Sequence, residues 1–276
     1  MRIVTWNMGF WSHRASHERA WYWLLETLKP DIALCQECIP PRWARKDWTI
    51  FWDKAAPDDS KQPWGTALLT RLLAKSARLP ELDLWLAQLP DRVQGKDELA
   101  GIQKADGWLA TAEINIPFIG PTLVVSVHNP FFPIECERLE GIDISSIKLK
   151  KNKDLWLLDV LFYFLRERLE NQLIVGGDFN YSRLLDDLYG ERGNHEFFDR
   201  IRDEGFMSFH RMFHEADEHT FFKKGAMGHQ LDYLYGDSSV ASYVESCEVV
   251  PYTQVMELSD HTPLIADFGS KPLRTI

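Results

Sequence analysis

The chain has 276 residues, of which 45% are hydrophobic and 26% charged, a composition typical of a soluble globular protein with a large apolar core. Its formal net charge of −10 argues against indiscriminate nucleic-acid binding through a broad positive surface. Because neither an apolar run of about 18 residues nor a signal-peptide pattern is present, we expect a cytoplasmic protein without stable membrane association.

The first 40 residues predict a strand, a helix and a second strand. The apolar run at residues 3–6 ends on Asn7, and the segment at residues 32–36 ends on Glu37. Between them, apolar side chains recur at helical spacing until Pro30 ends the pattern. Both predicted strands therefore end on a polar side chain.

The middle of the chain predicts further strands and one long insertion. Residues 64–71 predict a strand, and the apolar run at residues 123–127 ends on His128. Residues 72–107 carry no motif and are interrupted by prolines. We interpret them as an insertion that contains a short helix around residues 82–89.

A short stretch near residue 178 has the clearest strand-and-loop pattern. The apolar run at residues 173–175 suits a strand covered on both faces, and Gly176 and Gly177 let the backbone turn tightly. Asp178 and Asn180 then follow at the carboxyl end, where open α/β sheets place their ligands.

The last part of the chain predicts helices followed by strands. Helical patterns cover residues 154–169 and, from a cap at Asn194, continue to Gly205. We expect four segments to complete a second sheet: residues 220–222, 230–235, 245–250 and 264–268. Asp260 and His261 directly precede the last of these segments.

Three histidines, His210, His214 and His219, lie between the predicted helices and these strands. The spacing of His210 and His214 occurs in helical zinc sites, but the intervening Glu of the zinc-protease motif is missing. We interpret all three as structural or surface residues.

The strand ends and the final loop together present a set of hard oxygen ligands and imidazoles. The set is Asn7, Glu37, His128, Asp178, Asn180, Asp260 and His261. Carboxylate and amide oxygens suit a divalent cation such as Mg²⁺, and His moves protons near neutral pH. Because these ends form one site only if the first and last strands meet, we expect a single domain over residues 1–276.

Here the chain resembles the endonuclease/exonuclease/phosphatase superfamily, through short motifs in the family's order. They are Trp6-Asn7, Gln36-Glu37, residues 64–71, Val127-His128-Asn129-Pro130, Gly177-Asp178-Phe179-Asn180, Leu231-Asp232-Tyr233-Leu234 and Ser259-Asp260-His261. The resemblance implies a deoxyribonuclease-I-like α/β fold, a four-layer sandwich of two packed mixed β-sheets flanked by helices. It also implies hydrolysis of phosphate esters with Mg²⁺, or with Mn²⁺ as a substitute.

The predicted metal site follows from the charge of such a substrate. A phosphodiester repels an attacking hydroxide and has a poor leaving group, and a bound Mg²⁺ helps with both. We predict Glu37 and Asn7 as primary ligands and Asp260 as a further or water-mediated ligand.

The predicted catalytic residues are assigned by reach. His261 is the general base or proton carrier, and because consecutive side chains of an extended segment point to opposite faces, Asp232 orients its ring more easily than Asp260 does. The superfamily gives Asp232 the same role.

The remaining predicted residues face the phosphate. Asp178 positions the nucleophile or protonates the leaving oxygen, and Asn180 donates hydrogen bonds. His128 and Asn129 are predicted to contact the substrate, His128 at a non-bridging oxygen.

Two departures from the family pattern keep the function open. His128 stands where abasic-site endonucleases usually carry Tyr, and Gln230 stands where many nucleases have Arg. We expect foremost an intracellular Mg²⁺-dependent nuclease that prefers DNA to RNA. The alternatives are a phosphatase or phosphodiesterase for a small or lipid-derived phosphate ester, and an inactive partner-binding protein that kept the fold.

Overall fold

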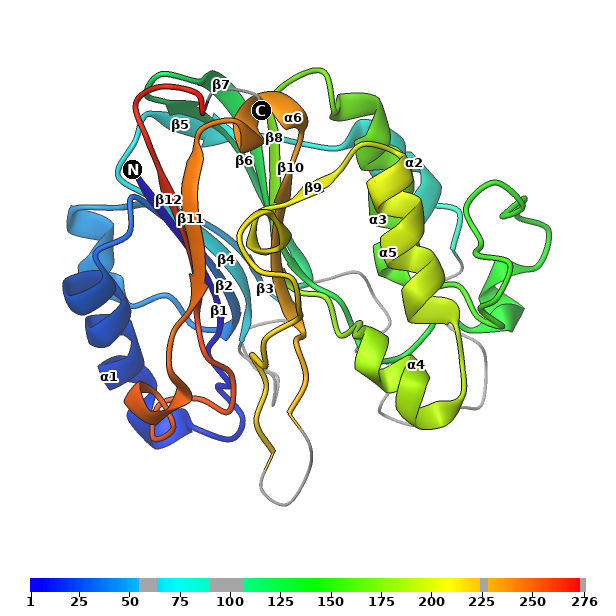
Figure 1. Cartoon of the computed structure of the whole chain (residues 1–276), viewed down its shortest axis with the longest axis horizontal. Coiled ribbons are helices and arrows are strands. Elements are labelled where there is room, and N and C mark those ends of the chain that lie inside the picture. Colours follow the sequence, from blue (N-terminus) through cyan, green and yellow to red (C-terminus); the bar gives the residue numbers. More distant parts are fainter. Residues whose placement is uncertain (55–63, 90–106, 224–227, 274–276) are drawn as a thin grey trace.

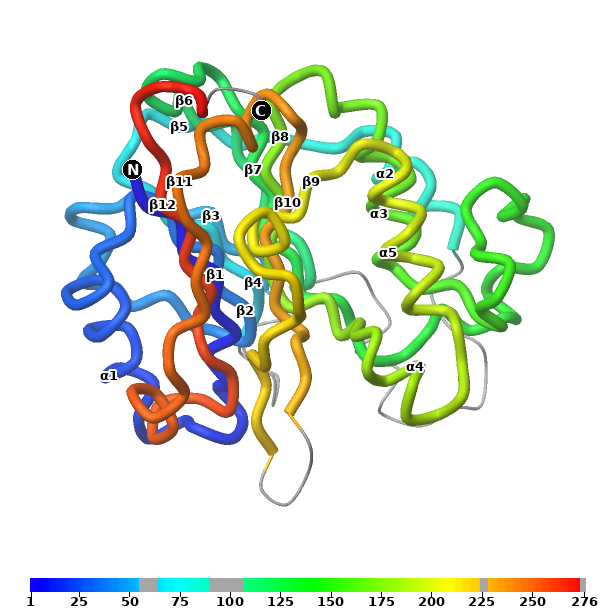
Figure 2. The backbone as a smooth tube through the Cα atoms, viewed as in Figure 1, coloured from blue at the N-terminus to red at the C-terminus, as the bar shows by residue number. Residues whose placement is uncertain are grey.

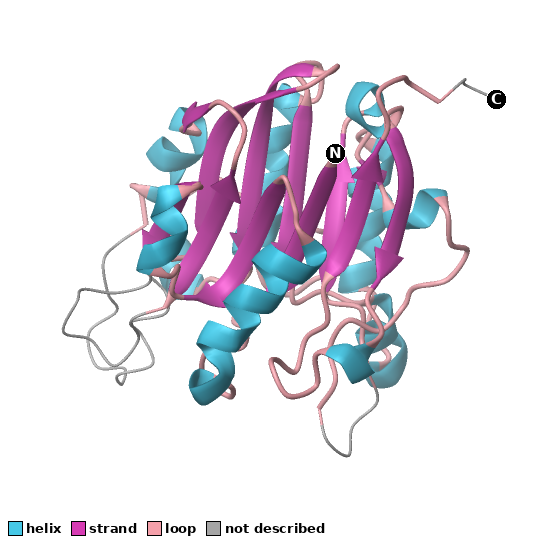
Figure 3. Ribbon diagram, turned by 90° about the vertical axis from the view of Figure 1, so that its left-hand side faces the viewer, coloured by secondary structure: helices cyan, strands magenta, loops and turns pink. Residues whose placement is uncertain are grey.

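The computed structural model describes residues 1–54, 64–89, 107–223 and 228–273. Its described part contains two six-stranded β-sheets packed face to face, with helices on both outer faces (Figure 1). This arrangement is the predicted four-layer α/β sandwich. Figure 3, with strands in magenta, shows how the helices cover the sheets from outside.

The first sheet joins the two ends of the chain. Its strands, in spatial order, are β11 (Val244–Val249), β12 (Leu264–Phe268), β1 (Arg2–Asn7), β2 (Ile32–Cys38), β4 (Gly65–Thr70) and β3 (Thr49–Lys54). β1 runs parallel to β2 and antiparallel to β12, so the first strand lies beside the last (Figure 2). The expectation that residues 245–250 and 264–268 belong to the second sheet is therefore wrong, because β12 pairs with β1 and β11 pairs with β12.

The second sheet has a similar plan, with one parallel pair at its centre. Its spatial order is β5 (Ala74–Ser76), β6 (Leu109–Ile116), β7 (Gly120–His128), β8 (Leu173–Asp178), β10 (Asp232–Gly236) and β9 (Met207–Ser208). β7 and β8 are parallel, and the other pairs are antiparallel. Residues 220–222, predicted as a strand, form only isolated bridges through Phe221 to His229 and His261.

The helices lie on the outside of the sandwich. They are α1 (His17–Tyr22), which continues as a π-helical stretch (Trp23–Leu28), α2 (Pro80–Leu86), α3 (Leu157–Leu165), α4 (Arg183–Tyr189), α5 (Gly193–Asp203) and α6 (Ser238–Ala241). α3 begins later than the predicted helix at 154–169, because Trp156 is extended and its backbone N–H donates to the Asp159 carboxylate. Asn194 does not cap α5 but lies in its first turn.

Three apolar layers hold the four structural layers together. Between the sheets, Ile3, Leu34 and Leu68 pack in one cluster with Ala112, Val124 and Ile174. A second cluster joins Trp21 and Leu24 of the α1 region to the first sheet, and a third joins Leu158 and Phe162 of α3 to the second sheet. Because the sheets share one apolar layer, we propose that residues 1–276 form a single domain.

Gly177 sets the spacing of β7 and β8. It lies inside β8 rather than in the predicted tight turn, and its φ is +148°. A Cβ at this position would overlap the carbonyl oxygen of Val127, so the strand tolerates only glycine there. This close approach keeps His128 at the end of β7 beside Asp178.

The predicted insertion at residues 72–107 is described only in part. Its described residues form β5 and α2, and α2 overlaps the helix expected near residues 82–89. Residues 90–106 lie outside the described part of the chain. Within the described residues, no helix has both the length and the apolar character needed to cross a bilayer.

Candidate active site

The strand pairing brings the predicted polar residues to one end of the sandwich. In the second sheet, Asp178 is the pairing partner of both His128 on β7 and Asp232 on β10. In the first sheet, Asn7 ends β1 beside the end of β2, where Glu37 lies. Side chains from both sheets therefore converge across the interface between them.

A cavity of about 240 Å³ opens at this convergence. Its polar lining consists of Glu37, His128, Asp178, Asn180, Asp260 and His261. Its aromatic lining consists of Trp11, Trp64, Trp108, Phe131 and Phe221. Three carboxylates and no Lys or Arg belong to the described lining, so the site carries negative charge that a bound cation would offset.

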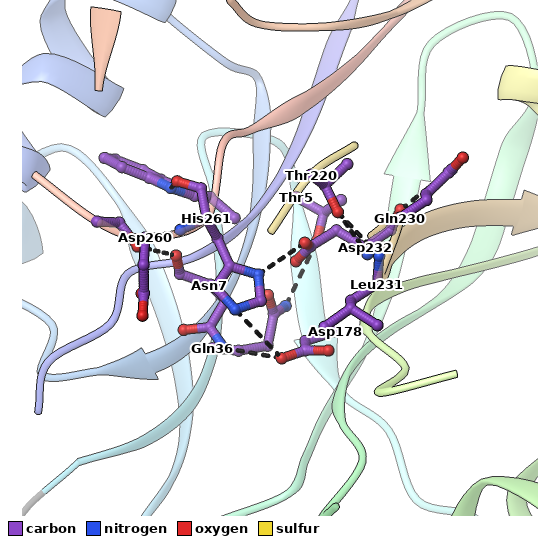
Figure 4. A network of polar contacts seen from close by, with 12 residues as sticks. Thr5, Asn7, Gln36, Asp178, Thr220, Gln230, Leu231, Asp232, Asp260 and His261 are labelled. Carbon is purple, nitrogen blue, oxygen red and sulfur yellow. Dashed lines mark hydrogen bonds and ion pairs between the residues drawn. The ribbon is translucent and has the colours of Figure 1, made fainter. Parts of the chain in front are cut away.

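His261 and Asp232 form a buried hydrogen-bonded pair (Figure 4). The ring Nδ1 lies 2.8 Å from Asp232 Oδ2, and because a carboxylate accepts, Nδ1 carries the proton that is donated. Trp6 Nε1 donates to the His261 carbonyl at 2.9 Å, and the His261 backbone N–H donates to Ser259 Oγ at 3.0 Å. These two hydrogen bonds fix the backbone of His261 in the loop before β12.

The protonation of His261 follows from its surroundings. Burial alone lowers its pKa, but the Asp232 carboxylate, its hydrogen bond and the charge of Asp178 outweigh burial and raise the pKa to about 10. The ring is therefore an imidazolium at neutral pH. Its Nε2 points toward Asp178 Oδ2, 3.9 Å away.

The Asp178 carboxylate lies among the hydrogen-bond donors of the site. Its Oδ2 accepts from Asn7 Nδ2 at 2.9 Å and lies 4.0 Å from His128 Nε2. Burial, opposed by the charge of His261, raises the pKa of Asp178 to about 6. A carboxylate with this pKa exchanges a proton readily near neutral pH. Burial also lowers the pKa of His128, and the His128 ring is therefore neutral near neutral pH.

Glu37 is held by an unusual backbone conformation at the end of β2. Its φ is +44°, and the register between β2 and β4 shifts between Cys35 and Cys38. Burial raises the pKa of Glu37, and the charge of nearby Asp260 raises it further, against the charge of His261 and a hydrogen bond from Asn7. Glu37 and Asp260 are therefore like charges that line the same cavity, and a divalent cation would offset both.

Asn7 is turned differently from the prediction that it is a primary metal ligand. Its Oδ1 accepts the backbone N–H of Gly9 at 3.0 Å, so its Nδ2 faces Asp178 and Glu37 Oε1, the latter 3.3 Å away. The side chain therefore presents a donor to both carboxylates. In this orientation it holds the two acidic side chains together rather than offering its oxygen to the cavity.

Of the two predicted asparagines, Asn180 lines the cavity and Asn129 does not. Asn129 is fully buried and outside the cavity lining, because its Nδ2 donates to Phe179 O and its Oδ1 accepts from Leu158 N. Asn180 lines the cavity with a φ of +49°, and its Nδ2 donates to the Asn129 carbonyl at 2.6 Å. Asn129 thus positions the loop that carries Asn180.

Thr220 and Ser259 support the site but were not predicted to do so. The Thr220 hydroxyl oxygen accepts the backbone N–H groups of Leu231 and Asp232 at 2.9 and 3.0 Å. Ser259 Oγ donates to the Asn7 carbonyl at 2.8 Å. Ser259 belongs to the recognised motif, whereas no sequence signal marks Thr220 as a support of Asp232, 12 residues further along the chain.

Comparison with solved structures identifies the fold. A 3′ phosphatase, NExo, from Neisseria, bound to a product DNA hairpin, has TM-score 0.61 and 18% identity over 98% of this chain and 99% of its own. An AP endonuclease from Archaeoglobus fulgidus has TM-score 0.64 and 17% identity over 97% and 99%. An endonuclease/exonuclease/phosphatase family protein from Leptotrichia buccalis has TM-score 0.61 and 15% identity over 98% and 99%.

These similarities confirm the fold predicted from the ordered motifs. The chain has the α/β sandwich of endonuclease/exonuclease/phosphatase structures over nearly its whole length. At sequence level, neither the known protein-family profiles nor the proteins of curated function gave a match.

Proposed function

We propose that the protein is a Mg²⁺-dependent phosphodiester hydrolase, and that it is an intracellular, cytoplasmic nuclease acting on DNA in preference to RNA. The observation that carries this proposal is the meeting of the His261–Asp232 pair, Asp178 and the Glu37–Asp260 pair in one cavity. The similar folds of a 3′ phosphatase bound to DNA and of an AP endonuclease support the same reaction class.

The residues present fit a hard divalent cation. Glu37 and Asp260 would hold Mg²⁺, or Mn²⁺ in its place, through carboxylate oxygens, and few protein ligands suffice for an ion that keeps several waters. When bound, such an ion would neutralise phosphate charge and stabilise the leaving oxygen. Asn7 would keep Glu37 and Asp178 in position through its amide nitrogen.

The proton roles are assigned to two residues. Asp178, with a pKa raised to about 6, accepts the proton of the attacking water. His261, with a pKa raised to about 10, stays protonated and donates a hydrogen bond from Nε2 to a phosphate oxygen while Asp232 holds the ring. This assignment differs from the sequence-based expectation, in which the His261–Asp232 pair activates the water.

The remaining polar residues orient the phosphate. Asn180 donates hydrogen bonds as negative charge develops, and neutral His128 contacts a non-bridging oxygen. Asn129 acts through Asn180 rather than by touching the substrate, because both of its side-chain polar atoms are engaged within the protein.

A second candidate function has one specific observation in its favour. The cavity is small and is walled by five aromatic side chains, so it suits a terminal phosphate or a small phosphate ester better than a continuous duplex. A phosphomonoesterase acting at such a group is therefore the alternative. An inactive partner-binding protein is disfavoured by the presence of Glu37, Asp178, Asp260 and His261 in one cavity lining.

A substrate panel separates these candidates. The protein, with Mg²⁺ or with EDTA, is incubated with supercoiled plasmid, single-stranded DNA, RNA, a 3′-phosphorylated DNA hairpin and a small phosphomonoester. Mg²⁺-dependent cleavage of DNA supports the nuclease. Release of phosphate without strand cleavage supports the alternative, and no turnover of any substrate contradicts both.

A further inference from the structure

A second group of histidine and carboxylate side chains lies away from the cavity. His210, His214 and Glu218 occupy the segment between β9 and β10, which begins with a short 3-10 turn, His210–Met212. This segment lies beside β11 of the other sheet, as the hydrogen bond from His214 to the Cys247 carbonyl shows (Figure 1, yellow beside orange). None of the three residues lines the cavity of the candidate active site.

His210 is buried without hydrogen-bond partners. Its side chain is 1% exposed, and neither ring nitrogen makes a hydrogen bond within the described part of the chain. Leaving such a buried polar group unsatisfied destabilises the fold. Because neither ring nitrogen is engaged, the neutral ring offers a free lone pair.

The tautomer of His214 is fixed by β11. Its Nε2 lies 2.8 Å from the Cys247 carbonyl oxygen, and because a carbonyl only accepts, Nε2 carries the proton. In the neutral ring, Nδ1 then presents a lone pair to Glu218 Oε1, 3.2 Å away. Two acceptors that face each other at this distance need a positive charge between them.

The same carboxylate oxygen also faces His210. Glu218 Oε1 lies 3.4 Å from His210 Nε2, and the two imidazole rings stack with centroids 4.3 Å apart. One ligand atom from each residue lies within 4.8 Å of the others. Two ligands held about 2.05 Å from a tetrahedral zinc ion are separated by about 3.3 Å, close to the two separations at Glu218.

We propose that His210, His214 and Glu218 form a binding site for a zinc-like divalent transition-metal ion, separate from the Mg²⁺ site of the cavity. Two imidazole nitrogens and one carboxylate are typical zinc ligands, whereas Mg²⁺ prefers oxygen alone. The Cys247 carbonyl orients His214 as an outer hydrogen-bond partner, a common arrangement for metal-bound histidine.

The site would join the edges of the two sheets. β9, which leads into His210, is the edge strand of the second sheet, and β11, which orients His214, is the edge strand of the first. Glu218 donates its backbone N–H to Gln230 Oε1 at 3.0 Å, which connects the cluster to the segment before β10. A bound ion would therefore stabilise the folded protein.

The competing explanation requires no metal. A doubly protonated His214 could pair with Glu218 and with Glu248, whose Oε2 lies 3.4 Å from Nε2. In that arrangement His210 Nε2 has only the 3.4 Å contact with Glu218 Oε1, and His210 Nδ1 has no hydrogen-bond partner among the described residues. Metal binding measured directly distinguishes the two explanations.

The test uses the full chain after dialysis against a chelator. Co²⁺ is titrated and followed by its visible absorption, Zn²⁺ is then added as a competitor, and thermal unfolding is recorded with and without Zn²⁺. We expect a tetrahedral-type Co²⁺ spectrum, its displacement by Zn²⁺ and a higher Tm. Glu218→Gln and His214→Ala are expected to weaken binding by at least about 100-fold.

Two further variants serve as controls. His219→Ala removes an exposed histidine of the same segment that is outside the cluster, and Glu37→Gln disables the cavity site. Both should keep the Co²⁺ spectrum. The proposal is overturned if Co²⁺ does not bind, or if Glu218→Gln and His214→Ala bind it as the wild type does. Loss of the spectrum in Glu37→Gln or His219→Ala would also overturn it, by placing the ion elsewhere.

Discussion

The cavity and the His210–His214–Glu218 cluster contain the same kinds of side chain but complete their contacts differently. In the cavity, His261 has a carboxylate near each ring nitrogen, with Asp232 at 2.8 Å and Asp178 at 3.9 Å. In the cluster, neither His210 nitrogen makes a hydrogen bond, although Glu218 Oε1 lies 3.4 Å from Nε2. The protein itself fixes the proton of His261, whereas His210 lacks a partner that a metal ion would supply.

The two regions also differ in the ligands they offer. The cavity presents carboxylate oxygens from both sheets, which suit Mg²⁺, and the cluster presents two imidazoles and one carboxylate, which suit zinc. A histidine beside a carboxylate therefore does not indicate one particular function by itself. What distinguishes the regions is that the ring of His261 has a hydrogen bond to a carboxylate, whereas the ring of His210 has no hydrogen bond.

The largest effects are expected from variants that disable one region and leave the other intact. His261→Ala and Asp178→Asn should each lower turnover by roughly 100- to 10,000-fold, because they remove a charged donor to the phosphate or the base. Both should retain Co²⁺ binding at the cluster. His214→Ala should show the reverse, with lost Co²⁺ binding and substantial turnover at a temperature well below its Tm.

The measurements are steady-state hydrolysis and Co²⁺ titration on the same preparations, with circular dichroism to show that each variant is folded. Wild-type turnover in either cavity variant would contradict the assigned roles. Loss of cluster binding in His261→Ala would show that the two regions are not independent.

His17 shows the effect of burial on a histidine that already has hydrogen-bond partners in the protein. Like His210 it is buried, but its Nε2 accepts hydrogen bonds from Trp21 Nε1 and Ile39 N at 3.1 and 3.0 Å. Burial lowers the pKa of His17 to about 4, and both bonds use the lone pair of the neutral ring. Since the unfolded chain takes up a proton near pH 6.5, His17 should lower stability by up to about 3 kcal/mol as the pH falls from 6.5 to 4.

Urea unfolding at pH 7.5 and pH 4.5 tests this expectation, with His17→Gln as the comparison because glutamine keeps an acceptor and does not titrate. The free energy of unfolding of the variant should fall less between the two pH values than that of the wild type. Equal losses would show that His17 does not stay neutral in the folded protein.

The smallest expected effect concerns Thr220, which connects the two regions. It lies two residues after Glu218, and its hydroxyl oxygen accepts the backbone N–H groups of Leu231 and Asp232. Thr220→Val leaves these buried donors unsatisfied and should lower the free energy of unfolding by about 2 kcal/mol. Thr49→Val, on an exposed position of β3, should change it by less than about 0.5 kcal/mol. Similar values for both variants in urea unfolding would argue against the role of Thr220.

Much of the fold and of the cavity was predictable because each signal is local. Apolar runs that end on Asn7, Glu37, His128 and Asp178 marked the strand ends, and the ordered motifs indicated the sandwich. The sheet to which β11 and β12 belong was not predictable from their own residues, because strand pairing depends on partners distant in the chain.

Side-chain orientation was the second limit. The residue type of Asn7 fits a metal ligand, but the backbone N–H of Gly9 turns its oxygen away from the carboxylates. Asn129 fits a substrate contact by type, yet both of its polar atoms are engaged within the fold. For the cluster, the spacing of His210, His214 and Glu218 is visible in the sequence, but the burial that leaves His210 without a partner is not.

Cleavage of an end-labelled DNA hairpin tests the central claim most directly. The chelated wild type is assayed in EDTA, then with excess Mg²⁺, beside Glu37→Gln at the same Mg²⁺ concentration. The expected result is no cleavage in EDTA, restoration by Mg²⁺ in the wild type, and restoration at least about 10-fold weaker in Glu37→Gln. Equal cleavage with and without Mg²⁺, or equal restoration in both proteins, would contradict a metal-dependent site built on Glu37.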